Sequence, residues 1–209
     1  PPTCLQGGTI ICLNDPLTLD AGPGYRSYRW SNGATTQSID ILQAGAYRVT
    51  VTNADGCEGT AEATTTESVK PETEILGDTV FCFNQNTTLR TSAAFSGYLW
   101  SNGATSPTID VTDSGTYSVT VTAADGCTAE ANLTVQEKEA LDVTISGDLD
   151  ICEGESTQLA GTMGFSTYTW STTATTPNIT VDAGNTYSLT VTDQAGCEGI
   201  ATTEVIENV

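Results

Sequence analysis

The cysteines are the residues of this chain whose type and spacing point most directly to chemistry. Six of the seven recur at intervals of 70 residues in two series, Cys12, Cys82 and Cys152, and Cys57, Cys127 and Cys197. Cys4 stands ahead of both series. A chain without histidine or a Cys-X-X-Cys motif favours disulfides over a zinc site, and disulfides persist in an oxidising compartment.

The spacing allows two ways of pairing these cysteines. One disulfide inside each repeat would give Cys12–Cys57, Cys82–Cys127 and Cys152–Cys197. Pairing between repeats would give Cys12–Cys127 and Cys82–Cys197, with Cys4–Cys57 in the first repeat and Cys152 left for a further repeat. The expected order of strands places the two cysteines of one repeat at opposite ends of a domain, about 20 Å apart, whereas bridged Cα atoms lie within about 7 Å. Pairing between repeats is therefore the preferred prediction, and pairing within repeats stays open.

The same period runs through the rest of the chain. The motif WSNGAT occurs at 30–35 and at 100–105, and the related WSTTAT occurs at 170–175. Self-similarity at a fixed period indicates an array of one structural unit. We therefore predict three domains, at 1–70, 71–140 and 141–209.

Each repeat has the pattern of a small β-sandwich. In the second repeat, Thr- and Val-rich segments predict strands at 73–77 with a continuation at 79–82, and at 87–93, 97–101, 107–111, 115–122 and 127–135. A Trp on the third strand and a Tyr soon after a Gly at the start of the penultimate strand are typical of an immunoglobulin-like sandwich. The expected core residues are Trp30, Trp100, Trp170, Tyr47, Tyr117 and Tyr187. The predicted fold class is all-β, with three tandem immunoglobulin-like β-sandwich domains stacked end to end through short, charged junctions.

The composition excludes several classes of function. The chain has 6 Lys and Arg against 26 Asp and Glu, no His, and a formal net charge of −20. Nucleic acid and anionic membranes repel such a surface, and no apolar run reaches the ~20 residues of a membrane helix, so we expect neither as a partner. Without His, the Ser, Thr and Cys side chains lack the usual base for nucleophilic catalysis, so we predict no enzyme and no catalytic residue.

Acidic residues at the domain ends are the candidates for holding a metal ion. Asp55 and Asp125 lie in turns before the second cysteine of their repeats, and Asp148 and Asp150 lie in an acidic segment of the third repeat. Carboxylate oxygens are the ligands that Ca²⁺ prefers. No EF-hand-like loop accompanies them, so the expectation is no cofactor, with calcium as the possible exception.

The segment YLWSNGATSPTIDVTDSGTYSVTVTAADGC at 98–127 resembles a known family. It is similar to the Ig-like and PKD-like tandem repeats of type IX-secreted surface proteins of the Bacteroidetes, including the SprB-type repeats of gliding-motility adhesins. The resemblance covers all three repeats. It implies export by the type IX secretion system and a bacterial cell-surface or extracellular location. It also implies possible O-glycosylation of Thr79, in the motif Asp-Thr-Val at 78–80.

The favoured function is therefore a non-catalytic structural or adhesive segment of a cell-surface adhesin or extracellular filament, a disulfide-stapled rod of Ig-like repeats. Its expected partners are further Ig-like repeats or copies of itself in a fibre. The alternative is a glycan- or calcium-binding accessory module of a secreted protein, in which Tyr25, Phe95 and Phe165 would contact surface glycans.

Overall fold

The computed structural model describes residues 7–208 of the chain. Within that part the three repeats form the same series of short strands, and no helix there could span a bilayer. The strands of the first repeat are β1 (Ile10–Cys12), β2 (Leu17–Asp20), β3 (Ser27–Trp30), β4 (Ser38–Ile41), β5 (Gly45–Thr52) and β6 (Glu58–Ser68). Those of the second are β7 (Ile75–Leu76), β8 (Val80–Phe81), β9 (Thr87–Thr91), β10 (Gly97–Trp100), β11 (Thr108–Val111), β12 (Gly115–Thr122) and β13 (Thr128–Glu137). Those of the third are β14 (Ile145–Ser146), β15 (Asp150–Cys152), β16 (Thr157–Gly161), β17 (Thr167–Trp170), β18 (Asn178–Val181), β19 (Asn185–Thr192) and β20 (Glu198–Asn208).

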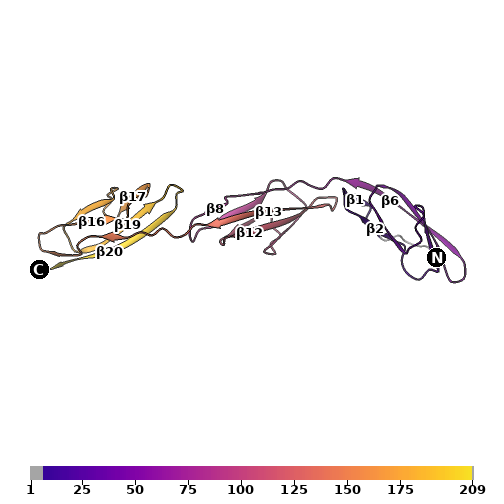
Figure 1. Ribbon diagram of the computed structural model, residues 1–209, viewed down its shortest axis with the longest axis horizontal. Coiled ribbons are helices and arrows are strands. Elements are labelled where there is room, and N and C mark those ends of the chain that lie inside the picture. Colours follow the sequence, from indigo (N-terminus) through magenta and orange to yellow (C-terminus); the bar gives the residue numbers. More distant parts are fainter. Residues whose placement is uncertain (1–6, 209) are drawn as a thin grey trace. The chain divides into compact units, whose positions relative to one another are not determined.

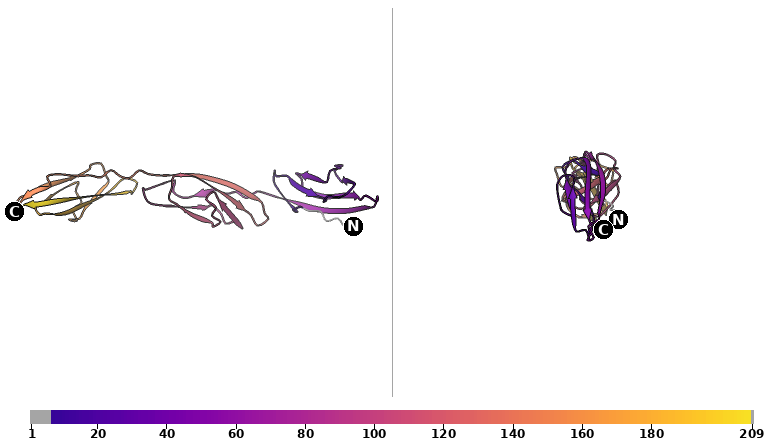
Figure 2. Two further views of the ribbon diagram at one scale, coloured as in Figure 1. Left: turned by 90° about the horizontal axis from the view of Figure 1, so that it is seen from below. Right: turned by 90° about the vertical axis from the view of Figure 1, so that its right-hand side faces the viewer.

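Each repeat is a two-layered sandwich (Figures 1 and 2). The larger sheets have the strand orders β1-β6-β5-β3, β8-β13-β12-β10 and β15-β20-β19-β17. The smaller sheets are β2-β4, β7-β9-β11 and β14-β16-β18. Two sheets with this order, and a Trp on the edge strand β3, β10 or β17 of each larger sheet, define an immunoglobulin-like sandwich, so the predicted fold class is confirmed. The chain consists of three tandem immunoglobulin-like domains of all-β structure.

One expectation about the strands is wrong. The segments 73–77 and 79–82 do not continue one strand, because β7 pairs antiparallel with β9 in the smaller sheet while β8 pairs parallel with β13 in the larger one. Gly77 lies between them with a φ of +155°, and a Cβ there would lie 2.7 Å from the carbonyl oxygen of Thr88. Glycine is therefore needed where the chain changes sheets, because any side chain would collide with the backbone of β9.

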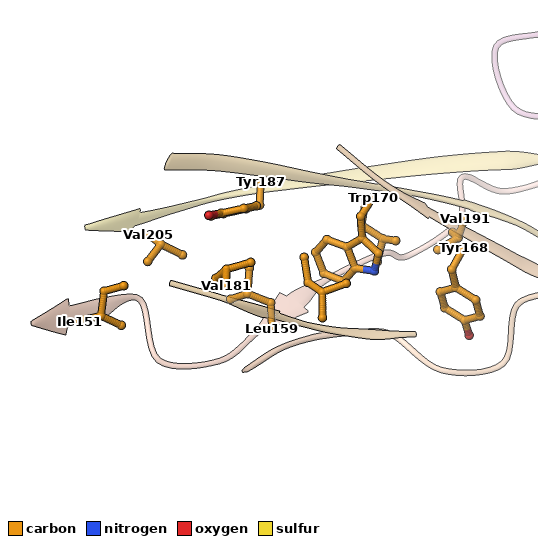
Figure 3. Packing of buried hydrophobic residues seen from close by; sticks show 10 residues of the cluster. Ile151, Leu159, Tyr168, Trp170, Val181, Tyr187, Val191 and Val205 are labelled. Atoms are coloured by element: carbon orange, nitrogen blue, oxygen red, sulfur yellow. The ribbon is translucent and has the colours of Figure 1, made fainter. Parts of the chain in front are cut away.

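The apolar residues of the strands meet between the two sheets. In the third repeat Leu159, Leu189 and Val191 are fully buried beside Trp170, which is 2 % exposed (Figure 3). The first repeat has the corresponding cluster around Leu19, Val49 and Trp30. Alternate residues of β4, β11 and β18 point inward, as the twofold period of a strand requires.

The tryptophan of each repeat is fixed by a turn as well as by burial. The indole Nε1 of Trp170 donates to the carbonyl oxygen of Thr176 at 2.9 Å, and Trp30 and Trp100 make the equivalent bonds. The turn that follows needs a positive φ at its third residue, which is Gly33 in the first repeat and Thr173 in the third, at 88° and 69°. WSNGAT is therefore a core anchor followed by a turn, and the third repeat keeps the turn without its glycine.

The predicted tyrosine corner is present but the three tyrosines differ in burial. The hydroxyl of Tyr187 donates to the carbonyl oxygen of Ala183 at 2.9 Å, and that of Tyr47 donates to Gln43 at 2.9 Å. Tyr187 is 6 % exposed, whereas Tyr47 and Tyr117 are only half-buried. Tyr187 is thus part of the buried core, and Tyr47 packs against the core of the first repeat from a partly exposed position.

By its internal contacts the chain divides into two compact units, and the division runs through the second repeat. Of the described residues, one unit contains 7–77, 88–109 and 116–134, and the other contains 78–87, 110–115 and 135–208. Each unit contains a disulfide that joins two repeats.

Candidate functional site: the disulfides between repeats

Within residues 7–208, two disulfides link consecutive repeats. Cys12 pairs with Cys127, and Cys82 pairs with Cys197, with Cα–Cα distances of 5.6 and 5.4 Å. Both pairs are 115 residues apart. These are the two bridges between repeats in the preferred scheme from the sequence.

The alternative scheme, with Cys12–Cys57, Cys82–Cys127 and Cys152–Cys197, is wrong. In the first repeat Cys12 lies opposite Ser68, the last residue of β6, whereas Cys57 precedes the first residue of that strand. A strand of 11 residues spans about 35 Å, far beyond the reach of a disulfide. The two cysteines of one repeat therefore face opposite neighbours along the chain.

The two cysteines of a bridge lie in different local structures, and each of these is called a half-site of the bridge. The first kind of cysteine follows a short strand, and the second kind lies in a turn. Cys82 follows the short strand β8, and its carbonyl oxygen accepts the N–H of Gln85 at 3.0 Å. Cys197 lies in the turn before β20, where the N–H of Asp193 donates to its carbonyl oxygen at 2.9 Å. Cys127 and Cys197 are 0 % and 5 % exposed, so the bridges are shielded on the side of the turn.

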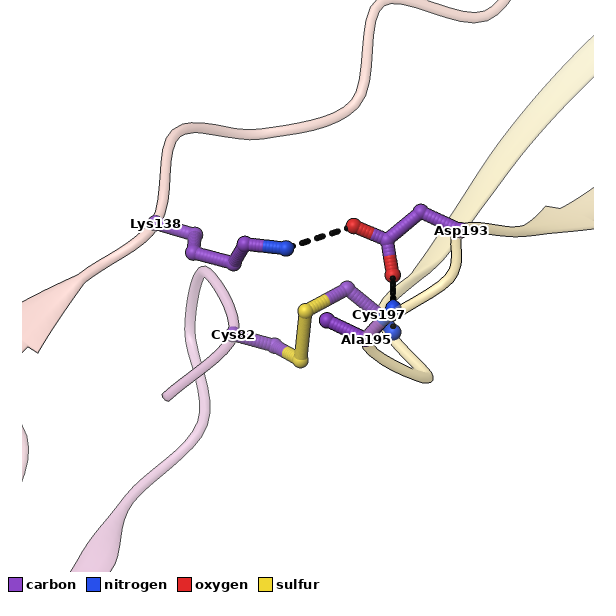
Figure 4. Close-up of polar contacts among 5 residues, drawn as sticks. All are labelled: Cys82, Lys138, Asp193, Ala195 and Cys197. Carbon is purple, nitrogen blue, oxygen red and sulfur yellow. Dashed lines mark hydrogen bonds and ion pairs between the residues drawn. A yellow bond between two sulfur atoms is a disulfide. The ribbon is translucent and has the colours of Figure 1, made fainter. Parts of the chain in front are cut away.

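An ion pair accompanies the bridge Cys82–Cys197 (Figure 4). The Nζ of Lys138 lies 2.6 Å from one carboxylate oxygen of Asp193. The other oxygen accepts the backbone N–H groups of Cys197 at 2.9 Å and Ala195 at 2.8 Å. The hydrogen bond from Lys138, followed by that from the Cys197 backbone, lowers the pKa of Asp193 below its ordinary value. One carboxylate thus orders the cysteine turn and contacts the preceding repeat.

Different polar contacts surround the bridge Cys12–Cys127. The hydroxyl of Ser68 donates to Asp125, whose other oxygen accepts the N–H of Cys127 at 3.0 Å. These bonds lower the pKa of Asp125, with the Ser68 hydroxyl as the larger cause. Lys70 pairs with Asp15 at 2.7 Å. Asp125 and Asp193 do not occupy equivalent positions of their repeats. The disulfide is therefore repeated along the chain, but the charged residues around it differ from one bridge to the next.

The acidic residues predicted for calcium are not gathered into a site. Asp125 is engaged by Ser68 and Cys127, and Asp148 accepts the N–H of Asp150 at 3.3 Å. Asp55 lies exposed in the turn before Cys57. No group of three or more His, Cys, Asp or Glu that could hold a metal ion occurs within residues 7–208. The structure therefore does not support the calcium expectation.

The remaining predicted residues fall outside this junction chemistry. Tyr25, Phe95 and Phe165 are half-buried and make edge contacts with Tyr28, Tyr98 and Tyr168, at centroid distances of 5.9, 6.1 and 6.4 Å. These rings pack into their own repeats and form no exposed aromatic platform. Thr79 is exposed, and its glycosylation stays a prediction.

Two cysteines within residues 7–208 have no disulfide partner there. They are Cys57 and Cys152, and both are exposed. Cys4 lies outside the described residues, so the pair Cys4–Cys57 stays a prediction. Sequence reasoning missed Lys138 and Asp193 as a pair, although a carboxylate four residues before a cysteine was a usable signal.

The comparisons with known proteins assign no family to the chain. No family model matches the chain, and no curated protein matches it. A solved structure of a 1.5-MDa bacterial ice-binding adhesin is 15 % identical, with 100 % of this chain and 99 % of that one covered and a TM-score of 0.33. The protein SGBP-B of a mixed-linkage glucan utilisation locus of Bacteroides ovatus is 15 % identical over 98 % of this chain and 67 % of that one, with a TM-score of 0.25. The N-terminal eight Ig domains of the Down syndrome cell adhesion molecule are 12 % identical over 96 % and 34 %, with a TM-score of 0.37.

Proposed function

We propose that this chain is a non-catalytic structural segment of an extracellular adhesin or surface filament, in which disulfides between repeats limit how far the chain extends under load. The observation that carries the proposal is the pairing of Cys12 with Cys127 and Cys82 with Cys197. A disulfide inside a domain stabilises that domain, whereas a disulfide between domains couples neighbours. The repeated spacing of 115 residues makes this coupling a property of the array.

The chemistry of the bridges supports an extracellular location. Disulfides persist in secreted and surface proteins and are rare in the reducing cytosol. The net charge of −20 adds solubility outside the cell. We extend the proposal to a bacterial surface protein of the kind that residues 98–127 resemble, with type IX export and a role in gliding adhesion as its specific form.

Single-molecule force spectroscopy tests the mechanical role. The chain is tethered at its two ends and stretched under oxidising conditions and again after reduction with dithiothreitol. We expect the oxidised chain to reach about a third of the extension of the reduced one, since the bridges shorten the covalent path between the ends. Equal extensions in both conditions would rule out load-limiting bridges.

The cellular part of the proposal has its own test. Antibodies against the purified chain should label intact cells of the source organism without permeabilisation. Labelling that requires permeabilised cells would contradict the extracellular assignment while leaving the bridges themselves unaffected.

A further inference from the structure

The structure contains two half-sites of the same bridge that are not joined to each other. Cys152 occupies the position of Cys12 and Cys82 in the third repeat, and Cys57 occupies the position of Cys127 and Cys197 in the first. Both bridges that the structure contains join one cysteine of the first kind to one of the second kind. Each of these two unpaired cysteines therefore has equivalents in the other two repeats that form disulfides.

The half-site at Cys57 already has the conformation of the paired turns. The N–H of Asn53 donates to the carbonyl oxygen of Cys57 at 3.0 Å, where Asp193 and Cys197 make the same bond at 2.9 Å. The Oδ1 of Asn53 accepts the N–H of Cys57 at 2.8 Å, as Asp193 does for Cys197 at 2.9 Å. Gly56 and Gly196 share a φ of 85°. The turn is thus formed before any partner is bound.

The half-site at Cys152 is equally formed. The N–H of Glu155 donates to the carbonyl oxygen of Cys152 at 2.9 Å, compared with 2.8 Å for Asp15 and Cys12. Cys152 lies opposite Asn208 at the end of β20, in the register that places Cys12 opposite Ser68 at the end of β6. The backbone around each cysteine therefore already has the hydrogen bonds of the paired repeats, which lowers the entropic cost of pairing.

We propose that Cys152 of one copy of this chain forms a disulfide with Cys57 of a second copy, so that the copies join head to tail. The contact is heterologous, because two different surfaces meet, and repeating it generates a linear filament. This inference does not rest on the mechanical proposal, since the bridges within the chain could limit extension whether or not copies join.

The bond requires an oxidant, for which we name a low-molecular-weight disulfide such as oxidised glutathione. The Cys57 thiolate attacks it, forms a mixed disulfide and releases one glutathione thiolate. The Cys152 thiolate of the other copy then attacks the Cys57 sulfur and releases the second. Two protein thiols are oxidised to one disulfide, and one glutathione disulfide is reduced to two thiols.

The charges around the two half-sites set the conditions for the test. Asp150, Glu153 and Glu155 surround Cys152, and Asp55 and Glu58 flank Cys57. These like charges repel, and no lysine occupies the place of Lys138, since Asn208 stands at that position of the repeat. Assembly is therefore assayed at about 0.5 M salt, where the Debye length falls to a few ångströms.

The experiment uses the whole chain with oxidised and reduced glutathione, non-reducing electrophoresis and peptide mapping. We expect a ladder of covalent oligomers and a linked Cys57–Cys152 peptide. A protein that stays monomeric, with or without a Cys4–Cys57 peptide, would overturn the proposal.

Two variants make the test specific. Both variants also carry Cys4→Ser, so that no third thiol can react. In this background Cys57→Ser and Cys152→Ser should each remain monomeric alone, and a mixture of the two should stop at the dimer, because only one complementary pair of thiols is then present. Dimerisation of either variant by itself would reveal symmetric pairing and overturn the head-to-tail bond. A melting temperature within a few degrees of the parent shows that each variant is folded, because both side chains are exposed.

Discussion

The bridge Cys82–Cys197 can be removed alone to test how the two disulfides share load. With both bridges present, the shortest covalent path between the ends runs through Cys12, Cys127, Cys82 and Cys197 in that order. That path contains about 70 residues, which limits full extension to about 240 Å at roughly 3.4 Å per residue. After complete reduction all 209 residues can extend, to about 700 Å.

In the double variant Cys82→Ser and Cys197→Ser, the path crosses only the bridge Cys12–Cys127 and then follows the chain to its end. It contains about 95 residues, so the limit rises only to about 320 Å. The effects of the two bridges on the maximum extension are therefore strongly non-additive. When the second bridge is present, the shortest path runs backward along the chain from Cys127 to Cys82.

The assay is force spectroscopy of the parent, the double variant and a Cys152→Ser control, each under oxidising conditions. The control should match the parent, since Cys152 is in neither bridge. An extension of the double variant close to that of the reduced chain would refute the reasoning, because it would mean that Cys12–Cys127 does not carry load by itself.

Three further predictions concern the domains and the junction. Leu159→Ala should destabilise the third repeat by about 2–5 kcal/mol in denaturant unfolding, because the side chain is 0 % exposed, and Leu99→Ala, at 56 % exposure, should change stability by less than about 0.5 kcal/mol. Tyr187→Phe removes the bond to Ala183 and should cost about 1 kcal/mol, seen as a melting transition lower by about 4–8 °C in calorimetry. Asp193 should titrate below its ordinary value of 3.8 by NMR, and Lys138→Met should raise that pKa. Because the pKa of Asp193 is lowered in the folded state, its contact with Lys138 stabilises the junction at pH values above the ordinary pKa, and this stabilisation is lost as the pH falls through the folded pKa. An unchanged pKa of Asp193 in Lys138→Met would contradict the assigned cause.

Sequence reasoning succeeded where the signal was local or strictly periodic. The alternation of apolar residues located strands such as β12, predicted at 115–122 and found there, and the tryptophan positions located the core. It failed for the first strand, because the change of sheet at Gly77 depends on which neighbour each half finds. It also gave Tyr47 and Tyr117 too much burial, since a strand pattern tells which face a side chain occupies but not how deeply neighbours cover it.

The sequence by itself determined the repeat, the class of fold and the order of the cysteines along the chain. The spacing of 45 residues within a repeat and 115 between repeats left two pairings open, and the length of a strand favoured one of them. Only the tertiary structure decided which carboxylates lie beside each disulfide and what they contact. Asp125 accepts a hydrogen bond from Ser68, 57 residues away along the chain, and Asp193 accepts one from Lys138, 55 residues away. Contacts between residues far apart in the sequence depend on how the surfaces of two repeats pack together, and a local sequence pattern does not specify that packing.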